Sequence, residues 1–185
     1  MRGGRKIAAA VTALGLGALV SSPALAGDPG SVADGVDRLE IEVTGYIAAR
    51  CAMGSIQDRH LGDIAGGGMS LRTELALDCN VPFDLTFAST NGGLAHATLP
   101  LGQGPYAGRL NYQMQVDLPV RLPAERVVSR QFSSDQMRAG AVVSSLNGIA
   151  DGAARIRMNF ENAPGAGLLA GRYSETVTIT LAPKT

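Results

Sequence analysis

The chain has 185 residues, and its 16 basic and 16 acidic side chains give a formal net charge of zero. This length suits a single domain with a sizeable core, and the charge balance argues against nucleic acid as a partner. With no tryptophan, two histidines and two cysteines, the chain carries few of the side chains on which catalysis usually depends.

The first 26 residues have the pattern of a secretory signal peptide. Arg2, Arg5 and Lys6 precede an apolar stretch over 7–20, and residues 22–26 end in an Ala-Leu-Ala cleavage site. The apolar stretch of 14 residues is shorter than the roughly 20 that span a bilayer. We therefore expect export, with a retained membrane anchor as the alternative. The mature chain would hold 159 residues, and its 13 basic and 16 acidic side chains would give a net charge of about −3.

Residues 39–47 alternate between two kinds of side chain. Polar or amphipathic residues occupy the even positions, and the odd positions hold Leu39, Ile41, Val43, Gly45 and Ile47. This period of two predicts a half-buried β-strand. The strand lies ahead of the first cysteine, so two interpretations stay open: an ordinary first strand of its own sheet, or a strand that adds to the sheet edge of a neighbouring molecule. Gly45 marks either a bulge or a point of close backbone approach.

Cys51 and Cys79 are the only two cysteines of the chain. In an exported protein such a pair is most simply a disulfide. Closing this loop would stabilise the fold by about 3–4 kcal/mol in the chain-entropy description. A metal site has no histidine pair nearby, and a thiol nucleophile would be oxidised beside the other cysteine.

Short segments with strand periodicity follow at close spacing. The clearest is the last, where Tyr173, Val177, Ile179 and Leu181 alternate mostly with threonines. We expect strands at 71–79, 83–87, 94–99, 109–118, 126–132, 141–146, 153–160 and 171–181.

Glycine, proline and asparagine separate these segments, most clearly in the turn sequence at 89–93. Residues 71–79 also fit a helix, but their alternation favours a strand. One helical turn is expected at 135–139, and residues 52–68 have the composition of a glycine-rich loop. The pattern predicts an all-β, antiparallel sandwich or barrel.

Motifs that carry chemistry are sparse. Asp58, His60 and Asp63 lie in a glycine-rich loop that fixes no geometry, and His96 has no partner recognisable from the sequence. No serine sits in a G-x-S-x-G setting, and Gly102-Gln103-Gly104 lacks the helix that a phosphate-binding loop needs. We therefore expect no catalytic residues, no metal and no cofactor, and we expect that the protein is not an enzyme.

Several of these motifs, in this order, resemble a subunit of the chaperone–usher fimbrial family, including its spore-coat-protein-U-like branch. Leu61-Gly62-Asp63-Ile64 is similar to the leucine–glycine element between the cysteines of such pilins. The segment at 83–94 looks like the one after the second cysteine in that branch, and 171–180 is similar to its final strand. The resemblance covers most of residues 39–181.

The resemblance implies an immunoglobulin-like β-sandwich that lacks its final strand, with a hydrophobic groove in its place. Residues 1–26 would be the signal peptide, 27–50 the extension with the donor strand, and 51–185 the sandwich domain. The donor strand would offer Leu39, Ile41, Val43, Gly45 and Ile47 to the next subunit, and the C-terminal strand with Tyr173, Val177, Ile179 and Leu181 would edge the groove.

The implied function is that of a structural subunit of an adhesive fimbria at the cell surface. Its partners would be related subunits, a periplasmic chaperone that first fills the groove, and an outer-membrane usher. Two alternatives remain: a self-contained secreted β-sandwich that binds a sugar or protein, and a hydrolase whose site assembles only in space.

Overall fold

The computed structural model describes residues 39–184; the expected signal peptide and the rest of 1–38 lie outside them, as does Thr185. The chain divides into two units, 1–44 and 45–185, and every strand belongs to the second. The elements are β1 (Cys51–Met53), β2 (Ser70–Leu75), β3 (Leu77–Cys79), β4 (Phe83–Ser89), β5 (Leu94–His96), β6 (Arg109–Leu110), β7 (Tyr112–Leu122), β8 (Ala124–Ser133), the 3-10 helix η1 (Gln136–Ala139), β9 (Ala141–Ser144), β10 (Ile149–Ala150), β11 (Ala154–Phe160), β12 (Tyr173–Ser174) and β13 (Val177–Pro183).

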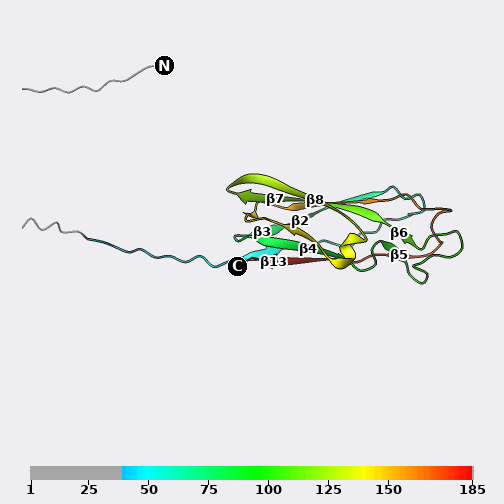
Figure 1. Cartoon of the computed structure of the whole chain (residues 1–185), viewed down its shortest axis with the longest axis horizontal. Helices are drawn as coiled ribbons and strands as arrows, with labels where there is room; N and C mark the ends of the chain where they lie inside the picture. Colours follow the sequence, from blue (N-terminus) through cyan, green and yellow to red (C-terminus); the bar gives the residue numbers. More distant parts are fainter. Residues whose placement is uncertain (1–38, 185) are drawn as a thin grey trace, which may run out of the picture. The chain divides into compact units, whose positions relative to one another are not determined.

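Antiparallel pairing organises the strands into two main sheets. In the first, β2 pairs with β11, β11 with β7, and β7 with both β8 and the short β10. In the second, β13 pairs with β4, and β4 with β9. Two small sheets, β1–β3 and β12–β5–β6, complete the fold. Figure 1 shows β7 and β8 in one layer and β4 and β13 in the other, so the expected all-β antiparallel sandwich is confirmed.

The core lies between these layers because both sheets alternate in the same way. Every second residue of β4 is buried, and so is every second residue along most of β7. The fully buried side chains from these two strands are Phe83, Leu85, Phe87, Tyr112, Met114, Val116, Leu118 and Val120. Burial of each such side chain contributes about 1.5–3 kcal/mol, which holds the layers together.

Most of the expected strands are present, with small shifts at their ends. The segment at 71–79 is a strand, as its alternation favoured, but it is interrupted at Ala76 between β2 and β3. The interruption lies where the chain changes partner, because β2 pairs with β11 and β3 pairs with β1; the carbonyl of Ala76 accepts a hydrogen bond from Gly54 N at 2.9 Å. The expected turn at 135–139 is η1, a 3-10 helix.

The alternating segment at 39–47, expected to be a strand, forms no strand in this structure. Residues 39–50 have no regular secondary structure, and the side chains of Leu39, Ile41, Val43, Tyr46 and Ile47 are 77–90% exposed. A strand needs a partner edge for its backbone, and none of the strand pairs includes these residues.

A disulfide joins Cys51 in β1 to Cys79 in β3, and these two residues are also direct partners in the strand pair. Asn80 reinforces this point: its side chain accepts a hydrogen bond from Arg50 N at 2.6 Å and donates one to Ala48 O at 2.9 Å. The chain that precedes the sandwich is therefore held from Ala48 onward.

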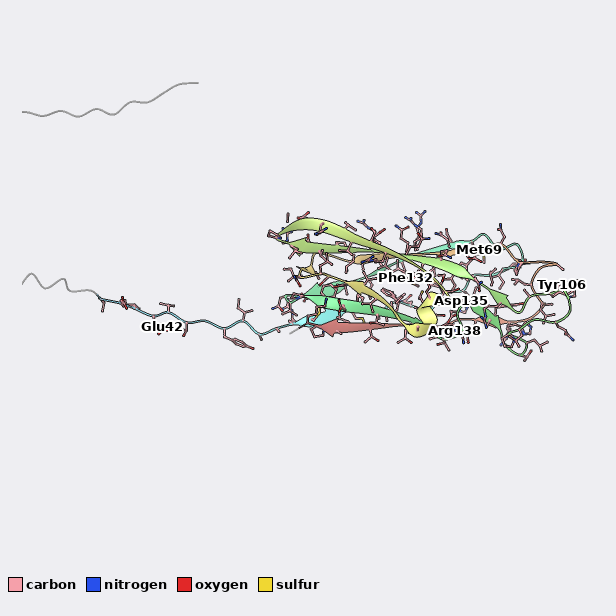
Figure 2. The ribbon with its side chains drawn as sticks, viewed as in Figure 1. Glu42, Met69, Tyr106, Phe132, Asp135 and Arg138 are labelled. Carbon is pink, nitrogen blue, oxygen red and sulfur yellow. A yellow bond between two sulfur atoms is a disulfide. The ribbon has the colours of Figure 1, made fainter. Side chains whose placement is uncertain are left out.

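Helix η1 closes one side of the sandwich. It packs against β4, β8 and β9, and its Met137 is fully buried. Figure 2 labels Asp135, which precedes this helix, and Arg138, which lies within it. On the opposite side, β1 contacts β13, but no strand within residues 39–184 pairs with the outer edge of β2 or β13.

Candidate functional site: a groove between two strand edges

The side between β2 and β13 carries two open strand edges. Among the strands of residues 39–184, β13 pairs only with β4, and β2 pairs only with β11. Each strand therefore has one edge whose backbone N–H and C=O groups are not used in a ladder. Such edges accept a further strand readily.

An apolar groove of about 240 Å³ lies at this side. Its lining comes from both sheets and from both halves of the sequence. The apolar residues are Ile56, Leu61, Leu71, Leu94, Met114, Ile156, Met158, Phe160, Val177 and Ile179. The groove therefore lies between the two open edges, and most of its lining residues are apolar.

Two of the residues expected at the C-terminal groove edge, Val177 and Ile179, line this groove. The third on the same face of β13, Leu181, is half-buried against the core and lies opposite Leu85 of β4. Tyr173 lies in β12, where its hydroxyl donates to the carbonyls of Ala107 and Leu169 at 3.0 and 2.7 Å.

Residues 54–69 partly cover the groove without completing either sheet. Ile56, Leu61 and Ile64 are half-buried against the core, and the first two line the groove. The backbone of 55–62, however, makes no hydrogen bond to any residue in the described part of the chain. The cover thus supplies side chains to the groove but leaves the strand edges open.

The polar residues of this cover do not form a metal site. Asp58 lines the groove, and the Asp63 carboxylate accepts a hydrogen bond from Ala65 N at 2.9 Å. Within 39–184, no group of three histidine, cysteine or acidic residues is arranged to hold a metal ion.

One end of the groove is fixed by Glu175, a residue that the sequence did not point out. Its Oε1 accepts hydrogen bonds from Thr90 N at 3.1 Å and Thr176 N at 2.8 Å, and its Oε2 from Gly93 N at 2.9 Å and Ser89 Oγ at 3.0 Å. One carboxylate therefore ties the loop after β4 to the start of β13. The only signal of these contacts in the sequence was the turn at 89–93, whose backbone N–H groups are available to an acceptor.

The groove floor rests on an aromatic pair. Phe160 lines the groove and lies against Tyr112, with ring centroids 5.5 Å apart. The Tyr112 hydroxyl is buried and makes no well-aligned hydrogen bond to the described residues. Burial raises the pKa of Tyr112 to about 12; the Ser89 hydroxyl opposes this shift, and the charge of Glu175 adds to it.

Both ring nitrogens of His96 have backbone partners. Its Nδ1 accepts hydrogen bonds from Thr98 N at 3.2 Å and Leu99 N at 3.1 Å, and its Nε2 lies 3.1 Å from Ala170 O. These contacts assign the proton to Nε2. The ring also meets Tyr173 edge-on at 5.2 Å, so His96 joins β5 to the chain around β12.

Neither a comparison with protein-family models nor one with curated protein sequences finds a match to this chain. Within residues 39–184, no helix is long and apolar enough to cross a membrane.

Proposed function

We propose that the protein is a structural subunit of an extracellular fimbria, assembled by donor-strand complementation. In this proposal, residues 39–47 of one subunit occupy the groove between β2 and β13 of another. The observation that carries the proposal is that one chain holds both an exposed alternating segment and an apolar groove between two open strand edges.

The two surfaces match in length and chemistry. A nine-residue strand spans about 30 Å, and the seven residues of β13 span about 23 Å, so one segment can cover the whole edge. Burial of Leu39, Ile41, Val43 and Ile47 would contribute about 6–12 kcal/mol before ordering costs. The backbone of the segment would complete the ladder that β13 leaves open.

The same features account for the proposed partners. An open edge beside an apolar groove favours aggregation when it is exposed. A periplasmic chaperone that lends a strand would protect the groove during export, and an outer-membrane usher would exchange that strand for residues 39–47 of the next subunit. These partners follow from the resemblance to the chaperone–usher family and place the protein in the periplasm in transit, then in a surface fimbria.

A peptide of residues 37–49 tests this proposal on the mature chain that lacks 27–46. We expect a one-to-one complex by native mass spectrometry and a higher melting temperature than that of the free chain. The control peptide carries Ile41→Asp and Val43→Asp, which put charges where apolar side chains should enter the groove. Equal effects of the two peptides, or no complex with either, would contradict the proposal.

A second candidate function is a self-contained secreted β-sandwich that binds a sugar or protein. The observation that favours it is the cover: Ile56 and Leu61 already occupy part of the groove. Such a module would remain monomeric with residues 27–50 intact, and the donor peptide would not change its melting temperature.

A further inference from the structure

Three arginines gather on the outer face of the first sheet, away from the groove. Arg72 of β2 lies directly opposite Arg157 of β11, and Arg155 is two positions before Arg157 on the same face. They border a hollow of about 250 Å³ together with Glu74 and Asp117. Because strand residues alternate between faces, these side chains point away from the core that Leu71 and Leu75 help to form.

The protein matches the positive charge of this cluster only in part. None of the three arginines forms an ion pair with a carboxylate in residues 39–184. The Nε atom of Arg157 is buried and has no hydrogen-bond partner among those residues. Like charges directly opposite each other on neighbouring strands are destabilising, and so is a buried donor without an acceptor. Both costs would be removed by one anion.

The nearby carboxylates limit which anion fits. Glu74 and Asp117 each lie opposite Arg155 on the neighbouring strands. Asp117 is occupied elsewhere: its carboxylate accepts hydrogen bonds from Ser129 Oγ at 2.7 Å and Gln115 Nε2 at 3.1 Å. The Ser129 hydrogen bond is the main cause that keeps its pKa below the usual range, so it stays charged. Three positive and two negative groups leave a surplus of one positive charge.

We propose that Arg72, Arg155 and Arg157 form a binding site for one carboxylate group, carried by an acidic sugar or a small organic acid. The planar guanidinium groups match a carboxylate through paired hydrogen bonds. A doubly charged phosphate would meet repulsion from Glu74 and Asp117, whereas the hydroxyl groups of an acidic sugar would donate hydrogen bonds to these two carboxylates. The site does not depend on the proposed function, because its arginines lie on the face of the sheet opposite to the groove.

The test is a titration of the mature protein with sodium glucuronate, sodium acetate and sodium phosphate at constant ionic strength, followed by backbone amide NMR shifts. We expect saturable shifts in β2 and β11 with glucuronate. Tighter binding of glucuronate than acetate identifies an acidic sugar, and equal binding identifies a bare carboxylate. Phosphate that binds as tightly as glucuronate, or shifts no larger than those with chloride, would overturn the proposal.

Variants separate the site from general charge effects. Arg157→Gln should weaken glucuronate binding at least tenfold, while Arg130→Gln on the exposed strand β8 should leave it unchanged. Arg72→Thr is a second test of the site, and its result does not depend on whether Arg157→Gln folds. It should also weaken binding, and it should raise the melting temperature of the ligand-free protein at low salt because the opposed arginines are separated. Unchanged binding in both Arg157→Gln and Arg72→Thr would overturn the assignment.

Discussion

The Oε2 atom of Glu175 accepts a hydrogen bond from the backbone N–H of Gly93 at 2.9 Å, across 82 residues of sequence. Gly93 has a positive φ of 149° and follows the turn that ends β4. This contact orients the turn against the start of β13, the strand whose free edge borders the groove. The shape of one groove end therefore depends on a single carboxylate.

Glu175→Gln should destabilise the fold by about 1–3 kcal/mol, because an amide offers one accepting oxygen where the carboxylate offers two, and its NH₂ group faces other donors. Chemical denaturation measures this loss. Glu161→Gln is the matched control, since the Glu161 side chain is exposed and has no hydrogen bond or ion pair to the described residues. Equal unfolding free energies for the two variants would show that the Glu175 contacts are not needed.

Tyr112→Phe should remove an alkaline sensitivity of the fold. The pKa of Tyr112 is about 12 in the folded protein and about 10 when unfolded, so the folded state keeps its proton where the unfolded state loses it. Ionisation of Tyr112 therefore does not reduce the free energy of unfolding below pH 10. As the pH rises from 10 to 12, this ionisation should lower the free energy of unfolding by about 2–3 kcal/mol. The variant should lack this decrease.

The comparison requires urea denaturation of both proteins at pH 7, 10 and 11.5. At pH 7 we expect the variant to be as stable as the parent or slightly more stable, since a buried hydroxyl without a good partner is removed. Tyr106→Phe in the exposed loop at the far end of the domain (Figure 2) is the control. The same alkaline loss in Tyr112→Phe as in the parent would refute the assignment.

The fold class could be predicted from the sequence because apolar residues alternate along 83–87 and 153–160. This alternation arises from the burial of one face of each strand. The disulfide was readable from the cysteine count of a chain that the sequence leads us to expect to be exported. Both properties depend on local sequence or on composition.

The groove and its supports were not readable in the same way. Leu71, Met158 and Val177 come together only through the order of strands in the two sheets, which periodicity does not encode. Glu175 and Arg157 belong to no recognisable sequence motif. Their roles depend on groups that the fold brings close to them, the backbone N–H groups around Glu175 and the charge of Arg72 opposite Arg157. The alternation of 39–47 predicted a strand, but whether it forms depends on a partner edge.

Gly45→Val should slow assembly and leave the domain unchanged. A Cβ atom at Gly45 meets no atom within 4 Å in this chain, so the substitution has room in the free subunit. Over a shallow part of a neighbour's groove, added methyl groups cost about 1–3 kcal/mol, which slows strand exchange by roughly one to two powers of ten.

The readouts are the polymerisation rate of chaperone–subunit complexes and the melting temperature of the isolated domain. Ala49→Val, outside the alternating segment, is the control and should change neither. Normal polymerisation by Gly45→Val would mean that position 45 does not lie in the groove.

Leu61→Ala should tighten binding of the donor peptide. In the free subunit, where residues 54–69 cover the groove, the half-buried Leu61 side chain contributes to stability. Truncation of this side chain to alanine should destabilise the free subunit by about 1 kcal/mol. If the donor strand displaces this side chain, the bound state does not lose that contribution, and affinity should rise roughly fivefold.

Calorimetric titration with the 37–49 peptide measures this change. Val127→Ala on β8 is the control, because Val127 is exposed and lies away from the groove. Weaker binding by Leu61→Ala would show instead that Leu61 remains in the filled groove and contacts the donor.

Hydrogen exchange of the backbone amides in β13 tests the central claim most directly. In the free subunit, the backbone N–H groups of residues 177–182 that do not face β4 have no strand partner within residues 39–184. Binding of the 37–49 peptide should slow exchange at alternate β13 positions at least a hundredfold and leave the amides at the free edge of β8 unchanged. Peptide binding without new protection in β13, or with protection at β8 instead, would contradict donor-strand complementation at this groove.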